Sequence, residues 1–208
     1  MPVRIICSSR RSCVGSHPSD KLGRMVRYES TIERDLIYLF EFDPKLIKYE
    51  EQPLTIEQIT HDGKRQKYTP DFLAVYTDKR WIYECKPEKH VNDEITKRQV
   101  EIGTQWASDN NCNFKLVTDK ELRSGPRLEN IKILWRYGNI KLREEEIRFV
   151  RDILKKSNRM TISALCELEW KATQRLELPR ILAMVYQKRI NIDLDIQINN
   201  CSCVWIDK

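Results

Sequence analysis

Two short motifs carry the residues best suited to chemistry in this sequence. Thr69-Pro70-Asp71-Phe72 supplies one carboxylate, and Glu84-Cys85-Lys86 supplies a second carboxylate and an amine, with twelve residues between Asp71 and Glu84. Carboxylates that meet among apolar neighbours are costly unless a hard cation compensates them, and Mg²⁺ is typically bound by one or two carboxylates, waters and a substrate phosphate. Beside a metal-bound water, a lysine can orient or deprotonate the nucleophile, or neutralise charge on the phosphorane.

These motifs need two neighbouring strands to bring them together. The residue pattern predicts strands over 67–76 and 80–85, with a turn at Thr77-Asp78-Lys79. Alternation along the second strand places Glu84 and Lys86 on one face, and a hairpin of this length brings Asp71 near Glu84.

Glu33 is a third candidate acid. The pattern of residues 30–42 predicts a helix, and Glu33 falls inside its apolar stripe, where a carboxylate needs a partner. One interpretation is a metal ligand. The other is a capping box, in which the Glu33 side chain returns to the Ser30 amide. The two downstream motifs favour the ligand role.

The remaining patterns predict an α/β fold, of the α+β kind, followed by a second small domain. Three strands over 47–59, 67–76 and 80–85 form an antiparallel meander, followed by a helix over 92–108, a strand over 114–118 and a bridging helix over 131–137. Helices over 142–156, from 161 and over 179–188 then precede strands over 190–195 and 202–206, an order typical of a winged-helix module. We therefore predict a flexible basic arm (1–27), a first domain (28–137) and a winged-helix-like domain (138–208).

Composition narrows the class of protein. The 208 residues are 33% charged and 40% hydrophobic, without an apolar run long enough for a membrane span or a secretory signal. Seven irregularly spaced cysteines indicate a reducing cytosol rather than a disulfide framework. The net charge of +6 permits a polyanionic partner.

The combination of Glu33, Pro70-Asp71 and Glu84-x-Lys86 resembles the PD-(D/E)xK nuclease superfamily. More specifically, the sequence from about residue 25 to 208 resembles TnsA, the endonuclease subunit of heteromeric transposases. The segments that carry this resemblance are Tyr28-Glu29-Ser30-Thr31-Ile32-Glu33-Arg34-Asp35, Tyr49-Glu50-Glu51-Gln52-Pro53, Tyr68-Thr69-Pro70-Asp71-Phe72, Glu84-Cys85-Lys86-Pro87 and Val117-Thr118-Asp119-Lys120-Glu121-Leu122.

The resemblance implies a restriction-endonuclease-like mixed sheet flanked by helices, followed by a small winged-helix-like domain. It implies that the side chains of Glu33, Asp71 and Glu84 hold Mg²⁺, for which Mn²⁺ substitutes. The backbone carbonyl of Cys85 adds a ligand, and Lys86 works on the attacking water. Some members of the family carry Gln where this chain has Glu84.

The resemblance also implies a role in transposition. Such subunits cut the 5′ ends of a mobile element in double-stranded DNA, while a TnsB-like transposase of the integrase type cuts and joins the 3′ ends. A TnsC-like AAA+ regulator couples both to target choice. This expectation places the protein in the prokaryotic cytoplasm, at the nucleoid when assembled on DNA. The alternatives are a stand-alone restriction or repair endonuclease, and a non-catalytic adaptor between DNA and protein.

Several basic residues are candidates for DNA contact. Lys97 and Arg98 lie on the helix after the second motif, where a solvated helix face is the alternative interpretation. The winged-helix-like domain contributes four more candidates, but that domain could equally dock a protein partner. These four are Arg175, Arg180, Lys188 and Arg189.

Overall fold

A computed structural model describes residues 13–59, 65–171 and 174–207. The chain divides into two compact units between Leu122 and Arg123. This division precedes the expected boundary at 137/138, because the helix at Arg127–Trp135 packs with a helix of the second unit. None of the helices in the described ranges is long and apolar enough to cross a membrane.

The first unit contains a four-stranded mixed sheet with strand order β3-β6-β7-β8. The first three strands pair antiparallel, and β8 runs parallel to β7. The elements of this unit are β1 Gly15–Ser19, β2 Arg24–Tyr28, α1 Thr31–Phe42, β3 Leu46–Glu51, β4 Ile56–Ile59, β5 Arg65–Tyr68, β6 Phe72–Tyr76, β7 Arg80–Lys86, a 3₁₀ turn Glu88–His90, α2 Glu94–Asp109, β8 Asn113–Thr118 and α3 Asp119–Leu122.

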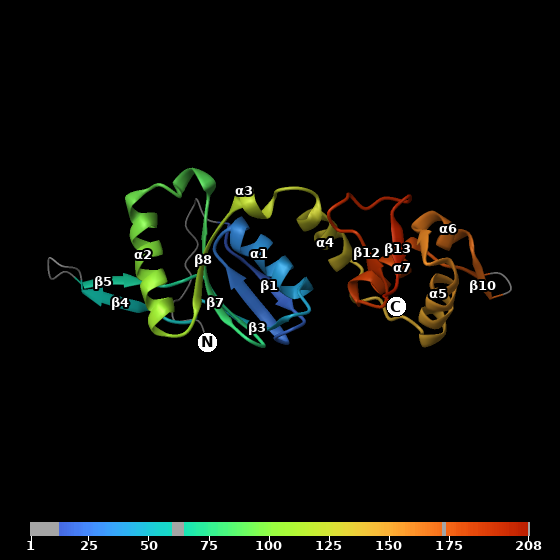
Figure 1. Ribbon diagram of the computed structural model, residues 1–208, viewed down its shortest axis with the longest axis horizontal. Coiled ribbons are helices and arrows are strands. Elements are labelled where there is room, and N and C mark those ends of the chain that lie inside the picture. Colours follow the sequence, from blue (N-terminus) through green and yellow to red (C-terminus); the bar gives the residue numbers. More distant parts are fainter. Residues whose placement is uncertain (1–12, 60–64, 172–173, 208) are drawn as a thin grey trace. The chain divides into compact units, whose positions relative to one another are not determined.

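Two helices cover opposite faces of this sheet, α1 on one face and α2 on the other (Figure 1). Alternation along the strands explains the two cores. Tyr83 and Cys85 of β7 pack with α1, in a core that includes Ile37 and Phe40. On the other face, Ile102 of α2 packs with Tyr68 and its neighbours. The expected α+β fold with a mixed sheet flanked by helices is confirmed.

The predicted strands over 47–59 and 67–76 are each broken in two. Gln52 has a left-handed φ of 45°, and Pro70 lacks the amide hydrogen that a continuous strand would need. The intervening chain forms a separate β4–β5 hairpin, whose connecting residues 60–64 lie outside the described ranges. The meander prediction is therefore corrected: β3 and β6 are sheet neighbours across an inserted hairpin.

Residues 13–27 do not continue the expected flexible arm, of which residues 1–12 lie outside the described ranges. They form the β1–β2 hairpin, which is anchored by the buried carboxylate of Glu41 on α1. Glu41 accepts hydrogen bonds from the Ser19 hydroxyl at 2.5 Å, the Asp20 amide at 3.0 Å and the Tyr49 hydroxyl at 2.7 Å. Such a charged acceptor stabilises the turn strongly.

Arg24 shows why the basic residues of the segment 13–27 do not indicate a flexible arm. Its guanidinium binds Glu51 through two hydrogen bonds of 2.6 Å each, and the Glu51 side chain is only 4% exposed. Burial raises the pKa of Glu51, but the hydrogen bonds and charge of Arg24 lower it more, so the pKa lies below its ordinary value. This basic residue therefore neutralises a buried acid instead of extending into solvent.

Among its described residues, the second unit combines four helices with a three-stranded sheet of order β12-β13-β9. Its elements are α4 Arg127–Trp135, α5 Glu144–Ser157, β9 Arg159–Thr161, α6 Ile162–Glu167, β10 Glu169–Lys171, β11 Gln174–Arg175, α7 Leu178–Tyr186, β12 Asn191–Ile192 and β13 Cys203–Trp205. The predicted helices are present. The sequence pattern missed β9 and the β10–β11 pair, because strands of two or three residues carry too few side chains for alternation to show.

Asn130 ties the loop between β12 and β13 to α4. This fully buried side chain donates to the carbonyl oxygens of Leu194 and Ile196, both at 2.8 Å. Its own oxygen accepts from the Ile198 amide at 3.0 Å. One side chain thus satisfies three backbone groups of an irregular segment, as buried backbone requires.

We expect Asn130→Ala to destabilise the second unit by about 3 kcal/mol, because three buried backbone groups lose their partner. Urea unfolding followed by circular dichroism measures the change, and Asn139→Ala at an exposed position is the control. An Asn130→Ala protein that unfolds at the urea concentration of the wild type would contradict this role.

Candidate active site

The strand pairing brings Asp71 next to the Glu84 segment. Asp71 immediately precedes β6, and its amide donates to the Tyr83 carbonyl oxygen of β7 at 3.0 Å. The Asp71 Oδ2 atom accepts from the Cys85 amide at 2.7 Å. The expected approach of Asp71 to Glu84 is therefore present. It follows from the antiparallel register in which Phe72 faces Tyr83.

Glu84 and Lys86 form a buried ion pair. Lys86 Nζ lies 2.6 Å from Glu84 Oε1. The Glu84 side chain is 2% exposed and the Lys86 side chain 25% exposed. Burial raises the pKa of Glu84 above its ordinary value, although Lys86 opposes this. Burial lowers the pKa of Lys86, but the charge and hydrogen bond of Glu84 raise it more, so its pKa lies above the ordinary value. Lys86 therefore carries its proton at neutral pH.

Tyr68 is a contact that the sequence pattern did not assign. Its hydroxyl donates to Glu84 Oε2 at 2.8 Å, so both oxygens of Glu84 have donors. Burial and the charge of Glu84 raise the pKa of Tyr68, which keeps the hydroxyl protonated. Gly103 lets α2 pack closely here, because a Cβ at position 103 would overlap the Phe114 ring and lie 3.1 Å from Tyr68 Cε1.

Glu33 lies in the first turn of α1, where its side chain contacts Ser30 and Glu29 but does not make the predicted capping-box bond to the Ser30 amide. Its Oε1 accepts from the Ser30 hydroxyl and its Oε2 from the Glu29 amide, both at 2.8 Å, rather than from the Ser30 amide. The Glu33 amide in turn donates to the Ser30 hydroxyl at 3.1 Å. Capping nevertheless leaves Glu33 within electrostatic reach of the other acids.

The three acids influence one another. Burial raises the pKa of Glu33, and the charge of Glu84 adds to this rise. Burial, then the charges of Glu84 and Glu33, hold the pKa of Asp71 well above its ordinary value. Mutual repulsion of this kind marks a group of carboxylates that a cation would stabilise.

These acids do not form a ready-made ligand shell. Within the described ranges, no group of three or more His, Cys, Asp or Glu residues is arranged to hold a metal ion. Each of the three carboxylates instead accepts hydrogen bonds from nearby protein donors.

The chemistry of the donor set still fits a hard divalent cation. All three side chains offer oxygen, and their mutual charges disfavour the fully ionised cluster without a counter-ion. Cys85 would contribute its backbone carbonyl, because its thiol packs in the apolar core on the α1 side and burial keeps the thiol pKa well above its ordinary value. The ligand roles of these residues stay predictions.

The predicted DNA-contact residues belong to both units. Lys97 is exposed on α2, 3.0 Å from Glu94, and Arg98 is exposed beside it. Lys188 and Arg189 are exposed after α7, with Arg189 Nη2 4.0 Å from Glu144. Arg175 is also exposed. Their roles stay predictions.

Arg180 has a structural partner. Its guanidinium binds Glu146, a buried residue of α5, with Nε 3.1 Å from Glu146 Oε2 and Nη2 in closer contact. The pair joins α5 to α7 and satisfies a carboxylate that burial would otherwise penalise. This ion pair gives Arg180 a structural role, and its role in DNA contact stays a prediction.

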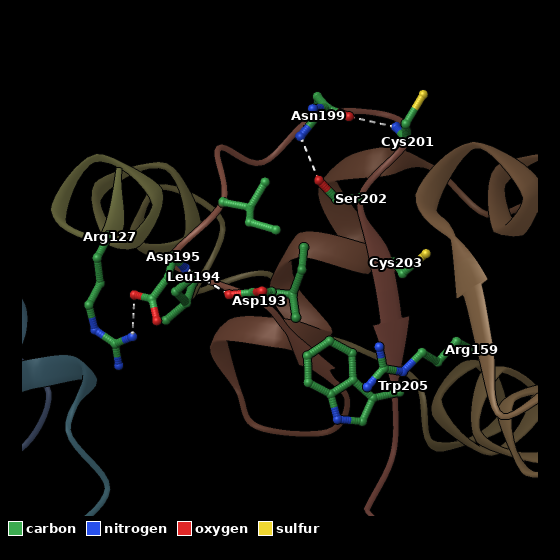
Figure 2. A pocket seen from close by; sticks show the side chains of 12 residues that line it. Arg127, Arg159, Asp193, Leu194, Asp195, Asn199, Cys201, Ser202, Cys203 and Trp205 are labelled. Carbon is green, nitrogen blue, oxygen red and sulfur yellow. Dashed lines mark hydrogen bonds and ion pairs between the residues drawn. The ribbon is translucent and has the colours of Figure 1, made fainter. Parts of the chain in front are cut away.

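A cavity of about 680 Å³ lies in the second unit, along the loop between β12 and β13. Figure 2 shows its lining side chains, among them Arg159 and Trp205. The Cζ atom of Arg159 lies over the Trp205 ring, 4.8 Å from the ring centroid. Arg127 pairs with Asp195 at 3.1 Å at another part of this lining. None of the acidic cluster residues, Glu33, Asp71 and Glu84, lines this cavity.

Comparison with known proteins supports the assignment of the first unit. Residues 43–119 match the family described as TnsA-like endonuclease N terminal. The matched segment includes Asp71, Glu84 and Lys86, but neither Glu33 nor the second unit. No curated protein matches the chain. The family match confirms, for residues 43–119, the resemblance to TnsA found in the motifs.

Proposed function

We propose that this protein is the Mg²⁺-dependent DNA endonuclease subunit of a transposase, and that it cuts the 5′ ends of a transposon. The observation that carries the proposal is the placement of Asp71 beside the Glu84–Lys86 pair on neighbouring strands of a TnsA-like domain. A strand-paired acid and an acid–lysine pair are the elements that metal-assisted phosphodiester hydrolysis requires.

The acids would hold the cation, and Lys86 would act on the substrate. Glu33, Asp71, Glu84 and the carbonyl of Cys85 are the proposed ligands, and Mn²⁺ would substitute for Mg²⁺. A bound cation supplies charge stabilisation for the phosphorane and a lower pKa for water. Attack by water breaks the bond between phosphorus and the 3′ oxygen, which leaves a 5′-phosphate and a 3′-hydroxyl.

The contact of Lys86 with Glu84 and its raised pKa support one of its two candidate roles. A lysine that is protonated at neutral pH donates hydrogen bonds and positive charge, so it does not serve as the base that deprotonates water. We therefore assign Lys86 to orienting the attacking water and neutralising charge on the phosphate. Its Nζ is held for this by Glu84.

The second unit supports a role in assembly on DNA. The order α5, β9, α6, α7, β12, β13, with β13 between the other two strands, fits a winged-helix-like module. Five consecutive residues of α7, from Ile181 to Val185, are buried, which leaves little of this helix to enter a groove. The exposed Lys188 and Arg189 are the better candidates for phosphate contact.

The proposed partners are double-stranded transposon ends, a TnsB-like integrase-type transposase and a TnsC-like AAA+ regulator. Support for them comes from the TnsA-like domain alone. We propose that the subunit acts in the prokaryotic cytoplasm and joins the nucleoid when it is assembled on DNA. Dependence on a partner also separates this proposal from a stand-alone restriction or repair endonuclease.

The test is a cleavage assay on DNA with a 5′-labelled transposon end. We expect the purified protein with Mg²⁺ to leave the DNA uncut, and to cut the 5′ end once a TnsB-like transposase and an ATP-bound TnsC-like regulator are added. Cleavage of plasmid by the purified protein alone would favour the stand-alone enzyme. Absence of 5′ cleavage in the full assembly would favour the adaptor and overturn the proposal.

A further inference from the structure

Gln52 has a strained backbone next to the acidic cluster. It directly follows β3, and its φ of 45° lies in the left-handed region that non-glycine residues rarely adopt. Such conformations are unfavourable for a residue with a Cβ atom, and they persist where the surrounding structure holds the residue in place. Two hydrogen bonds do so here.

Those two bonds fasten Gln52 to both sides of the cluster. Its amide donates to the carbonyl oxygen of Asp71 at 2.9 Å, and its side-chain Nε2 donates to Glu29 Oε1 at 2.9 Å. The amide of Glu29 in turn donates to Glu33 Oε2 at 2.8 Å. Gln52 therefore bridges the strand that presents Asp71 and the turn that presents Glu33.

The side-chain oxygen of Gln52, unlike its side-chain nitrogen, makes no hydrogen bond to the described residues. Gln52 is 8% exposed, and its Oε1 is a buried acceptor that has no hydrogen-bond partner among the described residues. A buried acceptor without a donor is unfavourable, because it has lost its hydrogen bonds to water and gained none in return. Native proteins seldom retain one without a reason.

The chemistry of the amide suggests that reason. Carbonyl oxygens of Gln are ligands for hard divalent cations, and unlike a further carboxylate they add no negative charge to Glu29, Glu33 and Asp71. The bond from Nε2 to Glu29 fixes which end of the amide is the oxygen end. Gln52 thus holds a buried neutral oxygen without a donor on a residue that is bonded to Asp71 and Glu29, two neighbours of the acidic cluster.

We propose that Gln52 Oε1 is a further ligand of the divalent cation, and that Glu29 is a positioning residue that orients the Gln52 amide. This inference rests on the proposed function, because it requires the acidic cluster to bind the cation. It adds a neutral oxygen from β3 to the acidic and backbone ligands from α1, β6 and β7.

Isothermal titration calorimetry of the full chain with Mn²⁺ tests the proposal. We expect Gln52→Ala to weaken Mn²⁺ binding about tenfold, a size typical for loss of an oriented group at a metal site. Gln58→Ala, in the β4–β5 hairpin away from the acids, is the matched control and should bind as the wild type does. Wild-type Mn²⁺ affinity in a folded Gln52→Ala protein would overturn the inference.

A second pair of variants separates a ligand from a purely structural glutamine. Gln52→Glu alone places a carboxylate against Glu29, whereas Gln52→Glu with Glu29→Gln exchanges donor and acceptor and restores the hydrogen bond. We expect the double variant to recover Mn²⁺ affinity to within about threefold of the wild type, since position 52 again offers an oriented oxygen. Affinity that stays as low as in Gln52→Ala, in a double variant that is as stable as the wild type, would refute a ligand at this position.

The same titration distinguishes failure of this inference from failure of the proposed function. If Asp71→Asn abolishes Mn²⁺ binding and Gln52→Ala leaves it intact, only the role of Gln52 falls. If the wild type binds no Mn²⁺, the proposed metal-dependent function falls and takes this inference with it.

Discussion

Asp71→Asn is expected to lower 5′-end cleavage by about 10²-fold or more while making the folded protein more stable at neutral pH. The amide oxygen can still accept from the Cys85 amide, which now lies 2.7 Å from Asp71 Oδ2, so the strand geometry is kept. What is lost is an anionic ligand for the cation. What is gained is relief from repulsion by Glu84 and Glu33, both of which raise the pKa of Asp71.

The pH dependence of this stabilisation has a definite sign. The pKa of Asp71 is higher in the folded protein than in the unfolded chain, so between the two values the folded state binds more protons and stability falls as the pH rises. Asp71→Asn removes this loss. In a metal chelator, the stability gained by the variant over the wild type should therefore be small at pH 4 and reach about 1 kcal/mol at pH 8.

Urea unfolding at several pH values, together with cleavage by the assembled transposase, measures both effects. Asp78→Asn, in the exposed turn between β6 and β7, is the matched control and should alter neither. Addition of Mn²⁺ should stabilise the wild type but not Asp71→Asn, because only the wild type binds the ion. Normal cleavage by Asp71→Asn would remove Asp71 from the site.

Local patterns predicted the part of this site that neighbouring strands create. Alternation along residues 80–85 placed Glu84 and Lys86 on one face, and the short turn at Asp78 required Asp71 to lie near them. Helix patterning likewise identified Glu33. Such features depend on residues close in sequence, and period and turn chemistry report them well.

The features that sequence patterns missed depend on contacts between distant residues. Arg24 belongs to a Ser- and Arg-rich segment that resembles a flexible arm, and only its pairing with Glu51 reveals an ordered hairpin. Gln52 meets Glu29 and Asp71 only after β3 and β6 become sheet neighbours. No local period carries this information, because the chain between β3 and β6 forms a separate hairpin.

Lys86→Met is expected to reduce cleavage by about 10²- to 10³-fold while Mn²⁺ affinity is kept. Lys86 Nζ contacts Glu84 Oε1 at 2.6 Å and is not itself a proposed ligand. Its loss therefore removes the group proposed to orient water and neutralise the phosphate, and leaves the ligands in place. Asp71→Asn should lose both cleavage and Mn²⁺ binding. The comparison of the two variants therefore assigns metal binding to one residue and the chemical step to the other.

Stability provides the control for this second prediction. Lys86→Met leaves the nearly buried Glu84 without its cation, which should destabilise the metal-free protein by about 3 kcal/mol at pH 8, and by less at pH 5, where Glu84 is more readily protonated. Lys86→Arg keeps the charge and should restore most of this stability, but its planar guanidinium cannot reproduce the position of the ammonium. Lys48→Met, at an exposed position of β3, should have neither effect.

Two outcomes would contradict this role of Lys86. If Lys86→Arg recovers both stability and full cleavage, the positive charge alone suffices. If Lys86→Met cleaves normally, the lysine serves only to neutralise Glu84.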